Sequence, residues 1–123
     1  MTGKLDGLDP ALLVVLARME QTVGRPLVVT SGKRPVMEND ALVTAGLAKP
    51  DSSHLTGKGG DLSAKTSGER LSLVAAAILA GVTRIGVGKD FVHVDVDEGK
   101  PQHVLWLYPC PLKHLEPVGR PGA

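Results

Sequence analysis

This sequence is poor in aromatic residues, in cysteine and in net charge, and each shortage excludes a class of protein. Its 123 residues contain one phenylalanine, one tryptophan and one tyrosine, so a core must be built from aliphatic side chains. A single cysteine, Cys110, excludes a disulfide framework and a thiolate zinc finger. Basic and acidic residues number 14 and 13, which gives no support for a nucleic-acid-binding face.

Long apolar runs are missing as well. No apolar stretch reaches transmembrane length, so we expect no insertion into a membrane. A signal peptide has a basic start before its apolar run, whereas here Asp6 and Asp9 precede the first apolar segment. We therefore expect synthesis in the cytoplasm. The length suits one compact domain, and 42% apolar residues supply its core. We expect that domain to be a monomer.

Two segments have the spacing of amphipathic helices. The first begins at Asp9-Pro10, a capping residue followed by a first-turn proline, and ends at Gly24. The second begins with a capping-box pattern formed by Thr66 and Glu69. Residues 36–46 are weakly helical, and residues 47–58 have the composition of a loop. The apolar face predicted for the second helix consists of Leu71, Val74, Ala75 and Ile78.

Short strands are predicted at five places, which are residues 27–30, 61–63, 83–87, 91–96 and 104–108. The last two are expected to pair as a hairpin around the turn DEGKPQH. Tight links between the final strands favour an α+β fold, with helices packed on a small, mostly antiparallel sheet. We expect one domain at residues 1–108 and a proline-rich C-terminal tail at residues 109–123.

Residues 52–61 read SSHLTGKGGD and place His54 seven residues before Asp61. The three glycines between them let the backbone bend, so that the two side chains can converge. Imidazole and carboxylate are the ligands that zinc takes where thiolates are missing, and a catalytic zinc keeps one position for water. Taken alone, a histidine in such a loop is a surface residue far more often than a metal ligand.

A second polar cluster lies in FVHVDVD at residues 91–97. On a strand, His93, Asp95 and Asp97 share one face, and the alternate valines share the other. This face is either part of a metal site or an ordinary solvated strand face. The remaining histidines, His103 and His114, lie in a turn and in the tail and are not candidate ligands.

The segment SSHLTGKGGDLSA at 52–64 resembles the S-x-H-x-x-G-x-x-x-D signature of the zinc D-alanyl-D-alanine carboxypeptidase family. That family includes phage L-alanyl-D-glutamate peptidases and shares its fold with the hedgehog signalling domain. Further matching segments follow in the family's order, and the resemblance covers residues 27–108. They are VVTSGKRP at 28–35, RIGVG at 84–88, FVHVDVD at 91–97 and VLW at 104–106.

The resemblance implies that His54, Asp61 and His93 ligate Zn2+. It also implies that Ser52 supports the His54 loop beside the substrate, and that Arg34 holds a substrate carboxylate or stabilises a developing oxyanion. Arginine suits that task because its planar fork donates two parallel hydrogen bonds and stays charged. Without the resemblance, Arg34 is interpreted as a surface arginine after a turn.

The resemblance also implies a general base three residues before the last ligand, and Asp90 fits that D-x-x-H pattern. A separation of three puts Asp90 and His93 on opposite faces of an ideal strand, so Asp90 must lie in a turn bent toward the metal. Asp95 is on the correct face, about 6.6 Å along the strand from His93. It is either the base or a partner that orients a ligand.

One departure from the family pattern concerns the residues before Asp61. Family members carry alanine in a G-x-A-x-D pattern, whereas Gly59 and Gly60 stand in that region here. The change loosens the backbone and removes no ligand.

The resemblance implies a zinc peptidase that hydrolyses the peptide stems of bacterial peptidoglycan. The type is either a D,D-carboxypeptidase or an L-alanyl-D-glutamate endopeptidase. We expect a phage or bacterial lytic enzyme that reaches the cell wall after release or as a virion component. The alternative is a catalytically silent, zinc-stabilised binding or phage structural module on the same fold, in which no acid reaches the attacking water.

Overall fold

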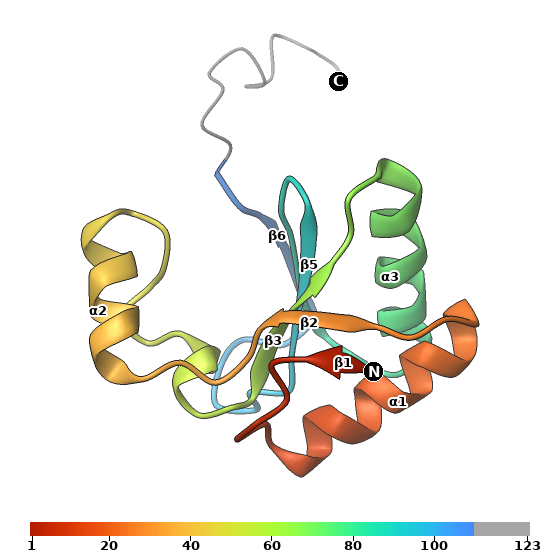
Figure 1. The fold of residues 1–123 in the computed structure, drawn as a ribbon, viewed down its shortest axis with the longest axis horizontal. Helices are drawn as coiled ribbons and strands as arrows, with labels where there is room; N and C mark the ends of the chain where they lie inside the picture. Colours follow the sequence, from red (N-terminus) through yellow and green to blue (C-terminus); the bar gives the residue numbers. More distant parts are fainter. Residues whose placement is uncertain (110–123) are drawn as a thin grey trace, which may run out of the picture.

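The computed structural model describes residues 1–109 and has a six-stranded sheet at its centre (Figure 1). The strands lie in the spatial order β1-β2-β3-β5-β4-β6. Their bounds are β1 Thr2–Gly3, β2 Val28–Ser31, β3 Gly59–Ser63, β4 Arg84–Val87, β5 Phe91–Asp95 and β6 Val104–Leu107. The inner pairings are antiparallel, and the edge pairings β1–β2 and β4–β6 are parallel. The predicted α+β fold with a mostly antiparallel sheet is therefore confirmed.

The helices of the described residues are α1 Pro10–Val23, α2 Val36–Thr44, α3 Ser67–Leu79 and a single 3-10 turn, η1 Ser53–Leu55. Both predicted cap signals are formed. The Asp9 side chain accepts a hydrogen bond from the Ala11 backbone N–H at 2.8 Å, and α1 ends at Gly24 with a φ of 73°. Thr66 and Glu69 make a reciprocal capping box at the start of α3.

The hydrophobic core lies between the sheet and the pair of helices α1 and α3. Figure 1 shows these two helices on one side of the sheet and α2 on the other. Leu12 and Leu16 of α1 are fully buried, as are Val92 and Val94 of β5. Since successive side chains of a strand alternate, the intervening residues of β5 face the α2 side. The core thereby fixes which residues of β5 are available to a site.

The predicted hairpin of the last two strands is wrong. β5 pairs with β3 on one side and with β4 on the other, so neither of its edges is left for β6. β6 instead lies parallel to β4, where Val104 N–H donates to the Thr83 carbonyl and Tyr108 N–H to the Val87 carbonyl. The turn DEGKPQH therefore crosses from the middle of the sheet to its edge.

The predicted apolar face of α3 is also wrong. The buried residues are Leu73, Ala76 and Ala77, whereas Leu71 is 71% and Ile78 60% exposed. The helix carries apolar residues around much of its circumference, so periodicity does not select one stripe. The face of α3 that packs against the sheet and α1 is the one with Ala76 and Ala77, whose small side chains permit close packing.

The remaining predicted strands are confirmed to within two residues at each end. The short edge strand β1 was not predicted, because two residues carry no periodicity. No helix in residues 1–109 is both long and apolar enough to span a membrane. Predictions for residues 110–123, including Cys110 and His114, lie outside the described residues.

Candidate metal centre

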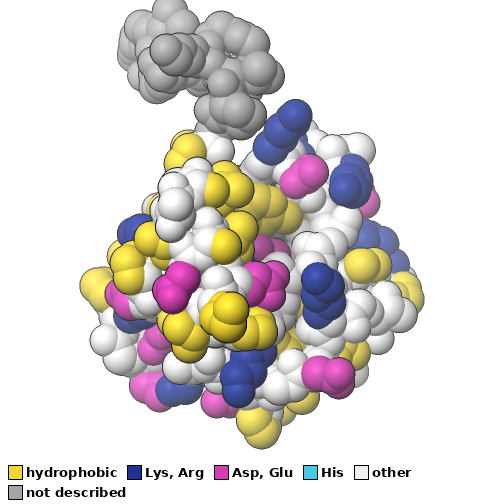
Figure 2. Space-filling model, turned by 60° about the vertical axis from the view of Figure 1, so that its left-hand side comes forward, with side chains coloured by type: hydrophobic (Ala, Val, Ile, Leu, Met, Phe, Trp, Pro, Cys, Tyr) yellow, Lys and Arg dark blue, Asp and Glu magenta, His cyan; other side chains and the backbone are white. Residues whose placement is uncertain are grey.

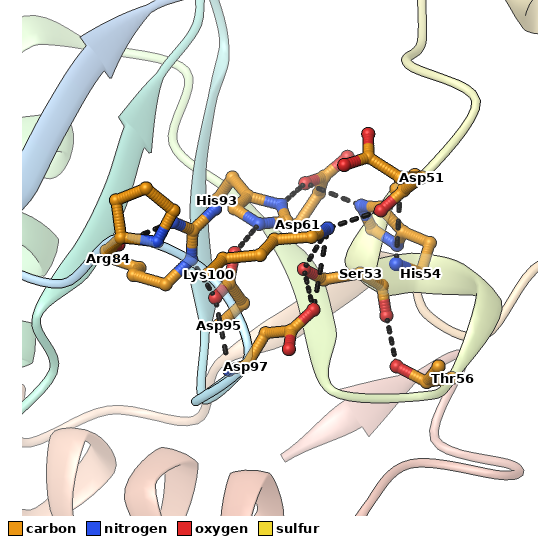
Figure 3. Close-up of polar contacts among 12 residues, drawn as sticks. Asp51, Ser53, His54, Thr56, Asp61, Arg84, His93, Asp95, Asp97 and Lys100 are labelled. Atoms are coloured by element: carbon orange, nitrogen blue, oxygen red, sulfur yellow. Dashed lines mark hydrogen bonds and ion pairs between the residues drawn. The ribbon is translucent and has the colours of Figure 1, made fainter.

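The three predicted ligands lie together although they come from three elements. His54 lies in η1, Asp61 in β3 and His93 in β5, and Asp61 is the residue directly opposite His93 in the antiparallel pairing. Ser52 caps η1 by accepting a hydrogen bond from the His54 backbone N–H at 3.2 Å. One ligand atom from each of the three residues lies within 4.8 Å of the others. Figure 3 shows the three side chains converging.

Each imidazole is oriented by a hydrogen bond on the side away from Asp61. His54 Nδ1 donates to the Gly32 carbonyl at 2.6 Å, which leaves Nε2 facing Asp61 Oδ1 at 3.2 Å. His93 Nε2 contacts Asp95 Oδ2 at 2.8 Å, which leaves Nδ1 facing Asp61 Oδ1 at 2.9 Å. Such outer partners fix the ring orientation that a metal ligand needs.

Burial and the contacts between the three side chains shift the pKa values of Asp61 and His93. Burial raises the pKa of Asp61, but hydrogen bonds from His54 and His93 outweigh it and bring that pKa well below its usual range. Burial lowers the pKa of His93, but the carboxylates of Asp61 and Asp95 outweigh it and raise that pKa. Two imidazoles and one carboxylate fit zinc, with a position to spare for water.

Asp95 is tied into the protein through both of its oxygens. Oδ2 contacts His93, and Oδ1 accepts from Arg84 Nε at 2.6 Å and from the Asp97 backbone N–H at 3.2 Å. Arg84 also donates to the Pro101 carbonyl at 2.7 Å, and its guanidinium lies 5.2 Å from the centroid of Trp106. The geometry is that of a residue that positions His93.

Asp90 is not brought into the site. Its side chain is 56% exposed and faces Lys65 at 3.9 Å, in the turn between β4 and β5. Asp51 is a carboxylate that the motifs did not indicate: it lines the cavity over the ligands, and its side chain has no hydrogen bond or ion pair among residues 1–109. Figure 3 draws it on the His54 side of the group. No sequence motif indicates Asp51, which is recognised only because it lines the cavity of the folded protein.

Arg34 lies in the same cavity and has side-chain donors that the described residues do not use. Nη2 donates to Ser52 Oγ at 3.0 Å and Nη1 to Ser31 Oγ at 3.4 Å, while its backbone N–H donates to the His54 carbonyl at 2.9 Å. Nε is buried and has no hydrogen-bond partner among the described residues. A buried donor without a partner is costly unless a ligand satisfies it.

Lys100 links the loop after β5 to the segment that carries His54. Sequence analysis did not indicate this residue. Its ammonium donates to the Asp51 carbonyl, to Ser53 Oγ at 3.1 Å and lies 3.4 Å from Asp97 Oδ2 (Figure 3). Ser53 Oγ in turn donates to Asp97 at 3.0 Å. The loop after β5 is thereby fastened to the segment that carries His54.

The cavity over the three ligands has a volume of about 640 Å³. Its polar residues include Arg34 and Asp51, and its apolar wall includes Phe91, Trp106 and Tyr108. Burial, together with the charge of Asp61, raises the pKa of Tyr108 to about 12. On the face drawn in Figure 2, hydrophobic side chains gather above a set of acidic side chains.

An open cavity over a two-histidine, one-carboxylate group is the arrangement of a mononuclear metallohydrolase. The sequence model of the peptidase M15 family matches residues 2–95, and the chain belongs to this family of metallopeptidases. The fold is similar to the crystal structure of the Serratia marcescens L-Ala D-Glu endopeptidase ChiX, with a TM-score of 0.63 and 23% identity. The match covers 75% of this chain and 82% of that one. No match was found among curated proteins.

The position of Asp95 leads to the first prediction. Asp95→Asn keeps the shape of the side chain but weakens its hold on His93, so we expect zinc affinity to fall about 10- to 100-fold. Competition against a chromophoric chelator measures the affinity, and Asp90→Asn is the matched control. If Asp95 were instead the general base, turnover would be lost while zinc affinity stayed that of the wild type.

Gly59 leads to the second prediction, since it stands at the alanine position of the family pattern. A Cβ there would lie 2.8 Å from Cε1 of His93, whose ring is held on both sides. We expect Gly59→Ala to cost roughly 1–3 kcal/mol of stability and to weaken zinc binding. In Gly60→Ala, the control, the nearest atom is 3.7 Å away, so little should change. Equal thermal unfolding and zinc affinity in the two variants would refute the constraint.

Proposed function

We propose that this protein is a zinc peptidase that hydrolyses the peptide stems of bacterial peptidoglycan. The observation that carries the proposal is the convergence of His54, Asp61 and His93 beneath an open cavity in a chain of the M15 family. The structural neighbour ChiX is an L-Ala D-Glu endopeptidase, which supports a cell-wall substrate. The protein would reach the wall after release from a cell or as a virion component.

His54 Nε2, Asp61 Oδ1 and His93 Nδ1 would hold the zinc. When bound, zinc would polarise the scissile carbonyl and make water nucleophilic at neutral pH. Arg34 would bind a carboxylate of the stem peptide through its guanidinium, or stabilise negative charge on the carbonyl oxygen. Ser52 holds both the Arg34 guanidinium and the backbone of His54, so it couples substrate binding to ligand geometry.

Three carboxylates compete for the role of general base. Asp95 has both oxygens engaged by the protein, and Asp90 lies outside the cavity lining. Asp51 lines the cavity with a free carboxylate, and Lys100 holds its backbone in place. We therefore propose Asp51 as the base that takes the proton from the attacking water and passes it to the leaving amine.

A catalytically silent, zinc-stabilised module is the second candidate. One observation favours it: the acid of the D-x-x-H pattern, Asp90, faces Lys65 rather than the cavity. If Asp51 does not act as the base either, the same three ligands would serve to stabilise the fold or to bind a partner.

The proposed function is tested by zinc content and by cleavage of synthetic stem peptides. We expect about one zinc per chain, lost to a chelator together with activity, and restored with zinc. Mass spectrometry of L-Ala-D-Glu-containing stems and of stems ending in D-Ala-D-Ala identifies the bond that is cut. Bound zinc without cleavage of either bond would favour the silent module, and a protein that never takes up zinc would contradict both.

The base assignment is tested by replacing each acid separately. Asp51→Asn is expected to lower kcat by about 100- to 10,000-fold, because proton transfer is lost, while zinc content stays at the wild-type level. Asp90→Asn should retain activity, since that side chain lies outside the cavity lining. The reverse result would assign the base to Asp90 and would require the β4–β5 turn to rearrange around the substrate.

A further inference from the structure

β4 carries a glycine where it passes between His93 and the last strand. Gly86 is directly opposite His93 in one pairing and is paired with Trp106 in the other. A Cβ at Gly86 would lie 2.5 Å from Cε2 of Tyr108 and 2.6 Å from Nε1 of Trp106. The missing side chain therefore makes the space in which these two rings lie beside a metal ligand.

The ring of Tyr108 is fixed by aromatic neighbours on several sides. Its centroid lies 5.0 Å from that of Phe91, 6.1 Å from that of Trp106 and 6.2 Å from that of His93. These separations are typical of attractive tilted and edge-to-face pairs. A ring held in this way presents its hydroxyl at one place without a further loss of side-chain entropy.

The hydroxyl of Tyr108 has a donor to spare. The Trp106 ring lies beside the Tyr108 ring, with the two centroids 6.1 Å apart, and no hydrogen bond to any of residues 1–109 takes up the phenolic proton. The O–H proton is then free to be donated to a ligand. Tyr108 lines the main cavity and a neighbouring one of about 290 Å³, and Arg34 and Asp61 line both as well.

We propose that Tyr108 is a catalytic residue that donates a hydrogen bond to the carbonyl oxygen of the scissile peptide bond. This inference rests on the proposed peptidase function. Water adds to the carbonyl carbon, the C–N bond breaks, and the proton of the water ends on the leaving amine. The Tyr108 O–H remains intact throughout, and its contact strengthens as negative charge develops on the carbonyl oxygen. Arg34 is then free to bind a substrate carboxylate.

Tyr108→Phe tests this role, because phenylalanine keeps the ring and its packing and removes only the hydroxyl. We expect kcat to fall about 100- to 1,000-fold, the loss typical of one oxyanion donor, with KM and zinc content near the wild-type values. A phosphinate analogue of the stem peptide mimics the tetrahedral transition state, and its inhibition constant should rise by a similar factor. Binding of the amine product, which lacks the scissile carbonyl oxygen, should not change.

Zinc content and thermal stability of Tyr108→Phe provide an independent check, since a merely structural role of the tyrosine would lower one or both of them. A wild-type kcat in Tyr108→Phe would overturn the proposal itself, as would a loss explained by lower zinc content or thermal stability.

The wild-type protein separates this inference from the proposed function. If the wild type cleaves a stem peptide and Tyr108→Phe does so equally well, the peptidase function stands and the role of Tyr108 is wrong. If the zinc-loaded wild type cleaves no stem peptide and does not bind the phosphinate, the proposed peptidase function is wrong, and the proposed role of Tyr108 is wrong with it.

Discussion

The carboxylate of Asp61, which contacts two imidazoles at once, is the interaction on which the site depends. It exists because β3 and β5 pair in a register that puts Asp61 directly opposite His93. A slip of one residue would turn His93 into the core and Val92 or Val94 out of it. The fully buried valines and His93 therefore enforce the same register from opposite faces of one strand.

The outer contacts of the site serve the same end. The Gly32 carbonyl and Asp95 leave one nitrogen of each imidazole directed at Asp61, and Arg84 and Lys100 anchor the strand and loop behind them. Without metal, the carboxylates of Asp61 and Asp95 raise the pKa of His93 and so favour its proton. Metal uptake must displace that proton, so zinc binding should strengthen as the pH rises toward this pKa and level off above it.

The sequence predicts more of this site than of the strand order. His54, Asp61 and His93 are found because their segments resemble the motifs of a zinc peptidase family, whereas residue types and spacing alone leave a surface loop and a solvated strand face open. The position of β6 could not be predicted from the sequence. A short turn between two strands favours a hairpin, and the sequence does not reveal that both edges of β5 are already paired. The buried face of α3 is missed for a related reason, since several apolar stripes compete and only tertiary packing selects one. Asp51 and Tyr108 belong to no spacing pattern, and only the folded cavity brings them to the ligands.

Two of the cations that line the cavity, Arg34 and Lys100, differ in the hydrogen-bond donors that they leave for a substrate, so the two ends of the cavity are not equivalent. The Lys100 ammonium is satisfied by three acceptors of the protein itself, so its charge mainly fastens the loops. The buried Nε–H of Arg34 is unsatisfied, and the smaller cavity includes Arg34, Asp61 and Tyr108 but not Lys100. A substrate carboxylate is therefore expected at the Arg34 end, next to Tyr108 and the ligand Asp61. Under the proposed function, the distance from that carboxylate to the scissile carbonyl would decide which bond of the stem peptide is cut.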